Sequence, residues 1–283
     1  MLINIFPDVS YVSATFLGIL LDAYGVFWGG NAICDLPGAK DQMRSLVSQG
    51  KVVGVLSNTT QMAESERSKL LKSGIEQGVH YHFLITSGEV TRTMLLQGLL
   101  PFQTPKKRYK VFGGIDSGNS PHHAIFQGTG YHEVDELSEA EFIFVTVPRL
   151  NGEDQVNPAV FIPGIESLIK QKLPMICSNP DLFANEGKPA RAVVRQGSIA
   201  LLYEQMGGKV FYIGKPNAGA YQMAMDAFRD LGVMDPKDVL MVGDTPETDI
   251  RGANAFGMQS ALVSSVERKL LATDVPTFKI ERL

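Results

Sequence analysis

Three aspartates of this sequence have surroundings that suit metal and phosphate chemistry. Asp244 and Asp249 stand five residues apart in the segment Val242-Gly-Asp-Thr-Pro-Glu-Thr-Asp249, and Asp22 follows an apolar run and precedes a glycine by three residues. Mg²⁺ takes hard oxygen ligands of this kind, and a carboxylate can act as a covalent nucleophile that forms an aspartyl-phosphate. Taken alone, Asp22 is better explained as a helix cap or turn residue, and the Asp244–Asp249 segment could be a capping box at the start of a helix. Together they predict a site where a cation offsets the repulsion between carboxylate and phosphate.

Groups suited to binding a phosphate stand at two other points of the chain. Ser57 and Asn58 follow an apolar run, and short polar side chains with nearby backbone N–H groups suit phosphate oxygens. They could equally cap the helix that we expect from Ala63. Lys215 follows Gly214, where its ammonium group can act as a point charge on a phosphate. Without the other residues, it would be interpreted as a solvated surface lysine.

Four short apolar runs end at these residues, and helical patterns separate them. The runs are Leu17–Leu21, Val52–Leu56, Val210–Ile213 and Val239–Val242, and the helical patterns are Asp41–Ser48, Ala63–Lys72 and Asn217–Leu231. Nearly continuous apolar runs are typical of strands buried on both faces of a parallel sheet. The alternation predicts an α/β fold with a doubly wound parallel sheet, which binds ligands beyond the carboxyl ends of its strands. We therefore expect Asp22, Ser57, Lys215 and Asp244 to converge at that edge.

The middle of the chain has a different pattern. Strand-like runs at Lys110–Phe112, Phe142–Val147 and Met175–Cys177 lie among many Gly, Pro and Asn residues. We expect an α/β domain at residues 89–188, inserted into a core made of residues 1–88 and 189–283. His122 and His123 follow Ser-Pro and are expected in a loop of this insertion.

Composition excludes several classes of protein. The 283 residues are 44% hydrophobic with a formal net charge of −4, which argues against a nucleic-acid or membrane partner. The two cysteines, Cys34 and Cys177, form no Cys-x-x-Cys pair and are expected to be reduced thiols. The apolar run 11–21 has no basic region before it, since the first Lys or Arg is Lys40. We therefore expect it to lead into a buried strand rather than to form a signal peptide, and we expect a cytoplasmic protein.

The four polar segments resemble, in order, the four motifs of the haloacid dehalogenase (HAD) superfamily. The resemblance is strongest at Gly-Asp-x-x-x-x-Asp followed by Ile-x-Gly-Ala-x-x-x-Gly. Three further segments, Thr86-Ser-Gly-Glu, Asn179-Pro-Asp and Gly197-Ser-Ile-Ala, resemble subclass IIA of the superfamily, the NagD-like phosphatases. That subclass has a Rossmann-like core with an α/β cap domain, which selects the substrate, inserted between the second and third motifs.

The resemblance implies a Mg²⁺-dependent phosphatase that hydrolyses a small phosphorylated metabolite, such as a sugar phosphate, through an aspartyl-phosphate. Asp22 would attack phosphorus, and the cap would cover the site and can mediate a homodimer. The Mg²⁺ ligands would be Asp22, the backbone carbonyl of Tyr24 and Asp244, with Asp249 as a ligand or as support. The transferring phosphoryl group would be bound by Ser57, Asn58 and Lys215.

Tyr24 departs from the family pattern. Phosphatases of the family usually have Asp-x-Asp in the first motif, and the second aspartate acts as general acid and base. A phenol with a pKa of about 10 is a poor base at neutral pH. Three explanations stay open: another group such as Glu247 or His122 supplies the proton, the leaving group needs none, as in an acyl phosphate, or the protein binds its ligand without turnover. Simple packing beside Phe27 and Trp28 would also account for the tyrosine.

The wording Asp-Ala-Tyr-Gly also resembles the first motif of the 2-haloacid dehalogenases. Those enzymes need neither a metal nor a proton donor, and their fourth motif usually lacks the first acid. Because Asp244 is present here, and the expected cap is not the helical cap of a dehalogenase, we favour phosphate chemistry.

Overall fold

The computed structural model describes residues 5–29, 36–114, 121–186, 191–264 and 269–283, so Cys34 lies outside the described residues. The chain forms two compact units. The first comprises Met1–Ser57, Ala63–Thr86 and Lys215–Leu283, and the second comprises Asn58–Met62 and Ser87–Gly214. No described helix is long and apolar enough to cross a membrane.

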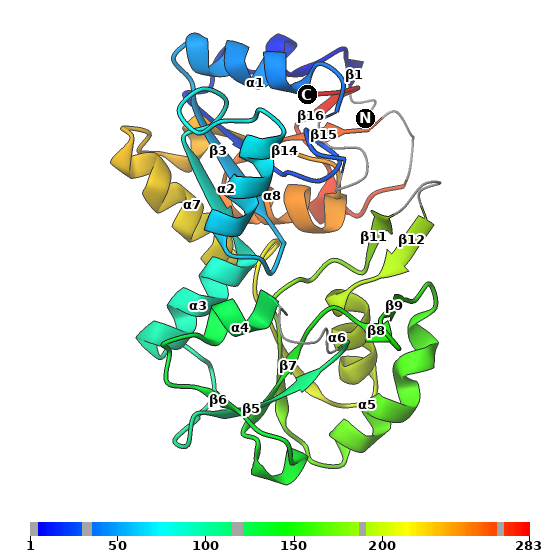
Figure 1. Cartoon of the computed structure of the whole chain (residues 1–283). Helices are drawn as coiled ribbons and strands as arrows, with labels where there is room; N and C mark the ends of the chain where they lie inside the picture. The colour runs from blue at the N-terminus through cyan, green and yellow to red at the C-terminus, as the bar shows by residue number, and fades with distance from the viewer. Residues whose placement is uncertain (1–4, 30–35, 115–120, 187–190, 265–268) are drawn as a thin grey trace. The chain divides into compact units, whose positions relative to one another are not determined.

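The first unit contains a seven-stranded sheet in the order β1-β16-β15-β14-β2-β3-β4 (Figure 1). All of its neighbouring strands pair in parallel. The strands are β1 (Ile5–Phe6), β2 (Gly18–Leu21), β3 (Val52–Ser57), β4 (Phe83–Thr86), β14 (Val239–Gly243), β15 (Gln259–Val263) and β16 (Phe278–Ile280). The helices are α1 (Ala39–Ser48), α2 (Ala63–Lys72), α7 (Ala218–Asp230) and α8 (Arg251–Phe256).

Helices cover both faces of this sheet. On one face, Met43 of α1 and Leu70 of α2 join a core cluster with Ile19 and Val53. On the other face, Phe228 of α7 packs edge-on against Phe83, with ring centroids 4.9 Å apart. Burial on both faces explains why the strands have continuous apolar sequences rather than alternating ones.

The second unit contains a five-stranded parallel sheet in the order β13-β10-β7-β5-β6. Its strands are β5 (Arg108–Phe112), β6 (His132–Glu133), β7 (Phe142–Val145), β10 (Pro174–Cys177) and β13 (Lys209–Tyr212). Two antiparallel pairs accompany it, β8 (Arg149–Leu150) with β9 (Glu153–Asp154) and β11 (Phe183–Glu186) with β12 (Arg191–Val194). The helices are α3 (Ser87–Gln97), α4 (Pro121–Phe126), α5 (Ile162–Ile169) and α6 (Gln196–Gln205).

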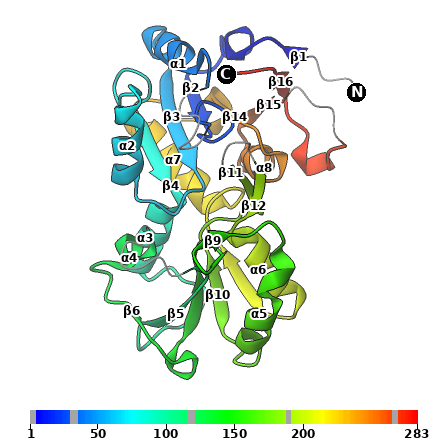
Figure 2. The ribbon, with the colours of Figure 1, turned by 45° about the vertical axis from the view of Figure 1, so that its right-hand side comes forward.

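The two faces of β7 are covered by different elements. Ile143 and Val145 belong to a core cluster that includes residues of α5 and α6, which lie on one side of the sheet (Figure 2). Phe142 and Phe144 point the other way, as alternate strand residues must. There they pack with Phe126 of α4, whose ring centroid is 5.0 Å from that of Phe144.

The prediction for the third apolar run was wrong. Val210–Ile213 was expected in the core sheet, but it forms β13 and pairs with β10 in the second sheet. Residues 189–214, which the sequence placed in the core, accordingly belong to the second unit, as do Asn58–Met62. Apolar runs of two fully covered parallel sheets look alike in sequence. His122 and His123 also differ from expectation, because they lie in α4 rather than in a loop.

Candidate active site

The predicted carboxylates lie at the carboxyl ends of neighbouring strands. Asp22 directly follows β2, and Asp244 directly follows β14. The two strands are paired, and the Asp22 N–H donates to the Val242 carbonyl over 2.9 Å. Ser57 is the last residue of β3, which pairs with the other side of β2. The sheet thus presents all three residues at one edge.

Asp22, Asp244 and Asp249 form one cluster. One carboxylate oxygen from each lies within 4.8 Å of the others. Asp22 and Asp249 are buried, and Asp244 is partly buried. Three acidic groups so close together would repel one another if all were ionised, and a cation relieves this.

Lys215 supplies a positive charge to the cluster. Its Nζ lies 2.6 Å from Asp22 Oδ1 and 2.7 Å from Asp249 Oδ1, and the residue is 1% exposed. The strand before Lys215 belongs to the second unit, yet Lys215 itself belongs to the first. Lys215 thus lies beside Asp22, although the strand that precedes it, β13, belongs to the second sheet and not to the core sheet.

A π-helical turn, Pro246–Ile250, positions Asp249. Its Oδ2 accepts a hydrogen bond from the Thr245 N–H over 3.0 Å. The Tyr221 hydroxyl donates to the Asp249 carbonyl over 2.9 Å. Such turns are rare and are often found at functional sites. One oxygen of Asp249 thus contacts Lys215 and the other fixes the turn through Thr245.

Two glycines allow the close approach of these carboxylates. A Cβ on Gly25 would lie 2.0 Å from Asp244 Oδ2, and Gly25 has φ +82°. A Cβ on Gly243 would lie 2.2 Å from Asp249 Cβ. Gly25 follows Asp22 by three residues, so the turn after β2 also makes room for Asp244.

Burial raises the pKa of Asp22 well above its ordinary value; Lys215 opposes this, while Asp249 and Asp244 raise the pKa further. Burial lowers the pKa of Lys215, but Asp22 and Asp249 more than offset that effect, and the pKa is raised. The raised pKa favours the charged form of Lys215, which offsets negative charge on the neighbouring carboxylates.

Asn58 belongs to the second unit, as do Ser87–Glu89 and Asn179–Asp181, which come from two further segments of the family pattern. The Ser87 hydroxyl donates to the Asn58 carbonyl over 2.9 Å. The Asn58 amide donates to Asp181 Oδ1, also over 2.9 Å. A Cβ on Gly88 would lie 2.6 Å from the Thr60 carbonyl oxygen, which explains the glycine after Ser87. Asp181 was not among the predicted site residues, although the Asn179-Pro-Asp segment pointed to it.

Comparison with known proteins identifies the family. The family model described as haloacid dehalogenase-like hydrolase matches residues 19–118, and the HAD-hydrolase-like model matches residues 212–277. The chain belongs to the haloacid dehalogenase-like hydrolases. Both matched ranges contain residues of the carboxylate cluster, which lies in the first unit.

Relatives of this hydrolase match over most of its length. It is 27% identical to the sugar-phosphatase AraL of Bacillus subtilis, over 87% of this chain and 82% of that one. It is 29% identical to chronophin of Rattus norvegicus, over 88% of this chain and 78% of that one. A haloacid dehalogenase-like hydrolase from Brucella suis has the same fold, with a TM-score of 0.81 at 23% identity over 98% of this chain and 99% of that one.

In this hydrolase, Tyr24 stands where the first motif, Asp-x-Asp, usually has its second aspartate. Its side chain is at the border of exposure, at 36%, and its backbone bridges to Trp28. Each of the two proton donors considered from the sequence has another charged partner. Glu247 is exposed and acts on Arg251, while His122, in the second unit, contacts Glu133.

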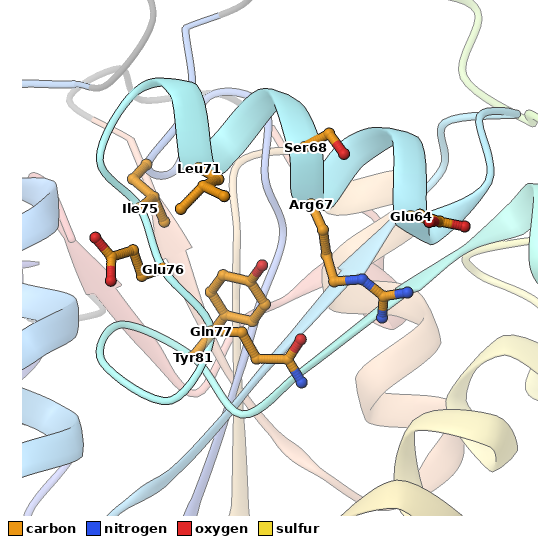
Figure 3. A pocket seen from close by; sticks show the side chains of 8 residues that line it. All are labelled: Glu64, Arg67, Ser68, Leu71, Ile75, Glu76, Gln77 and Tyr81. Carbon is orange, nitrogen blue, oxygen red and sulfur yellow. The ribbon is translucent and has the colours of Figure 1, made fainter.

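A separate cavity of about 360 Å³ lies in the first unit. Figure 3 shows Arg67 and Leu71 of α2 on one side of it and Gln77 and Tyr81 on the other. None of its lining residues was predicted as a site residue. Asp22, Asp244 and Lys215 do not line this cavity, so it is distinct from the site built around Asp22.

Proposed function

We propose that this hydrolase is a Mg²⁺-dependent phosphatase of small phosphorylated metabolites, with sugar phosphates as the first class to test. The observation that carries the proposal is the Asp22 carboxylate at a strand end, 2.6 Å from Lys215 Nζ and clustered with two further aspartates. The relatives support phosphate ester hydrolysis as the reaction, since they include a sugar-phosphatase and a dihydroxyacetone phosphatase.

The cluster fits a bound Mg²⁺ by the chemistry of its donors. Asp22 and Asp244 would hold the ion, with Asp249 as a further ligand or as the support of Lys215. Carboxylate oxygens with several waters are the usual Mg²⁺ environment. When bound, the ion supplies positive charge that offsets the repulsion between Asp22 and the phosphate.

Asp22 performs the transfer. One oxygen of Asp22 forms a bond to phosphorus as the bond from phosphorus to the leaving oxygen breaks, which gives an aspartyl-phosphate. Water then attacks the phosphorus of this acyl phosphate, inorganic phosphate leaves, and Asp22 is regenerated. Lys215 offsets charge on Asp22 and on the phosphoryl oxygens, and Ser57 and Asn58 orient the group. Positioning and electrostatic stabilisation provide most of the catalysis in such reactions.

Among the described residues of the first unit, the charged groups that act on Asp22 include no evident proton donor, and this constrains the leaving group. Among the described residues, the charged groups acting on Asp22 are Lys215, Asp249 and Asp244. Burial beside Asp22 and Asp249 raises the pKa of Lys215, which makes it a poor proton donor. Acyl and aryl phosphates have leaving groups that depart without protonation, so we expect them to react faster than alkyl esters.

The identity of Tyr24 also favours a second candidate, a binding protein on a phosphatase fold. Without an acid or base, the site would still hold Mg²⁺ and a phosphate through Asp22, Asp244 and Lys215. Such a protein would be stabilised by these ligands without turnover.

The test is phosphate release from p-nitrophenyl phosphate, acetyl phosphate and a panel of sugar phosphates, with Mg²⁺ or with EDTA. Asp22→Asn removes the nucleophile, and Asp226→Asn is the matched control, because the Asp226 side chain is 60% exposed on α7. We expect Mg²⁺-dependent release that Asp22→Asn abolishes and Asp226→Asn leaves unchanged. No release from any substrate, with Mg²⁺ still raising the melting temperature, would exclude the phosphatase and support the binding protein.

A further inference from the structure

A second cluster of metal-ligating side chains lies in the second unit. It consists of His122 and His123 on α4 and Glu133 on β6. One ligand atom from each residue lies within 4.8 Å of the others. None of the three belongs to the unit that holds the aspartate cluster, so the site is a separate one.

The geometry of this cluster suits a tetrahedral ion. His122 Nε2 lies 3.2 Å from Glu133 Oε2. In a tetrahedral zinc site with bonds of about 2.0–2.2 Å, two neighbouring ligand atoms stand about 3.3 Å apart. The His122 and His123 ring centroids lie 4.1 Å apart with the ring planes tilted by 37°, and one nitrogen of each ring lies within 4.8 Å of a Glu133 oxygen.

We propose that His122, His123 and Glu133 bind a transition-metal ion of the zinc class. Two imidazole nitrogens and one carboxylate oxygen are ligands that Zn²⁺ takes readily. Mg²⁺ prefers oxygen ligands throughout, so the two sites differ in the ion that they select. The proposal does not rest on the proposed phosphatase activity.

The proposed ion would join two short elements of the second unit. Helix α4 has six residues and β6 has two, and β6 is an edge strand of its sheet. Elements this short are marginal alone. His122 is 4% exposed, and its ring lies 6.4 Å from that of Phe144 in the sheet. An ion between α4 and β6 therefore ties both elements to the apolar face of β7.

The test is a titration of the full chain with Zn²⁺ by calorimetry, in Mg²⁺ sufficient to occupy the aspartate cluster. Co²⁺ in place of Zn²⁺ reports the coordination geometry through its visible spectrum. The variants are His123→Ala and Glu133→Gln, and the latter can still accept a hydrogen bond from His122. The matched control is His132→Ala, because His132 is exposed and neighbours Glu133 on the strand, where consecutive side chains point to opposite faces.

We expect one Zn²⁺ per chain, bound at micromolar concentration or tighter, with a tetrahedral Co²⁺ spectrum. Each of the two variants should weaken binding at least about tenfold, as loss of a supporting group does at metal sites, while His132→Ala should not. Asp244→Asn should leave Zn²⁺ binding intact. Absence of stoichiometric binding, an equal loss in His132→Ala, or a loss in Asp244→Asn would each overturn the proposal.

Discussion

At the scale of single residues, the site around Asp22 carries more negative than positive charge. Three aspartates cluster within 4.8 Å, and Lys215 is the cation acting on Asp22 among the described residues. Burial and the two other carboxylates hold the pKa of Asp22 above its ordinary value despite Lys215. The protonated carboxyl is not a nucleophile, so the raised pKa limits activity on the acid side.

The first prediction concerns this acid limb. A cation at the cluster favours the ionised form of Asp22 and lowers its pKa. In the pH profile of kcat/KM, we expect the acid limb to move to lower pH as Mg²⁺ rises toward saturation. Addition of NaCl to the same ionic strength controls for screening. An acid limb that stays fixed at all Mg²⁺ concentrations would argue against Asp22 as a group that contacts the ion.

The second prediction concerns Tyr24. Placing a carboxylate there by Tyr24→Asp should supply the missing acid and base, and a positioned group of this kind contributes about 10²–10⁴ in rate. We expect kcat for a sugar phosphate to rise within that range, while the rate with acetyl phosphate rises much less. Tyr24→Phe keeps the ring and removes the hydroxyl, and should change neither. A large loss in Tyr24→Phe would show that the phenol itself takes part.

At the scale of elements, the sequence predicted the strands that position the carboxylates but not the origin of Lys215. Apolar runs located β2, β3 and β14 to within a residue or two, because strands covered on both faces have no polar positions. The same pattern occurs in β13, which belongs to the other sheet. Which strands pair depends on contacts between residues far apart in the chain, and the local apolar pattern of a single sequence does not reveal those contacts. The Asn58–Asp181 hydrogen bond was out of reach for the same reason, since it joins residues 123 positions apart.

The third prediction concerns the turn after β2. Gly25→Ala places a methyl group against Asp244, in a backbone conformation that L-residues adopt at a cost of about 1–2 kcal/mol. Gly38→Ala is the matched control, because Gly38 has φ +80° and no atom within 4 Å of its Cβ position. Both variants should lose stability in urea unfolding. Only Gly25→Ala should also weaken Mg²⁺ binding and lower activity, and an equal loss of Mg²⁺ affinity in both would contradict the contact with Asp244.

At the scale of the whole molecule, the two units have separate apolar cores and can be followed separately. The chain contains one tryptophan, Trp28, which is 4% exposed and belongs to the first unit. Its fluorescence therefore reports the first unit alone, whereas far-ultraviolet circular dichroism reports the helices and strands of both. The aspartate cluster lies in the unit with Trp28, and the aromatic cluster around Phe142 lies in the other.

The fourth prediction uses this difference. Phe142 and Phe228 are both fully buried, the former in the second unit and the latter in the first, and replacing a buried Phe by Ala costs about 3–5 kcal/mol. Phe228→Ala should lower the unfolding midpoint seen by Trp28 fluorescence, whereas Phe142→Ala should lower only a transition seen by circular dichroism. Mg²⁺ at 100 times its dissociation constant should stabilise the Trp28 transition by about 2.7 kcal/mol, because an ion that binds only the folded state adds its binding free energy to that state. If Phe142→Ala moved both signals equally, the two units would unfold as one cooperative structure, and Mg²⁺ bound in the first would then stabilise both.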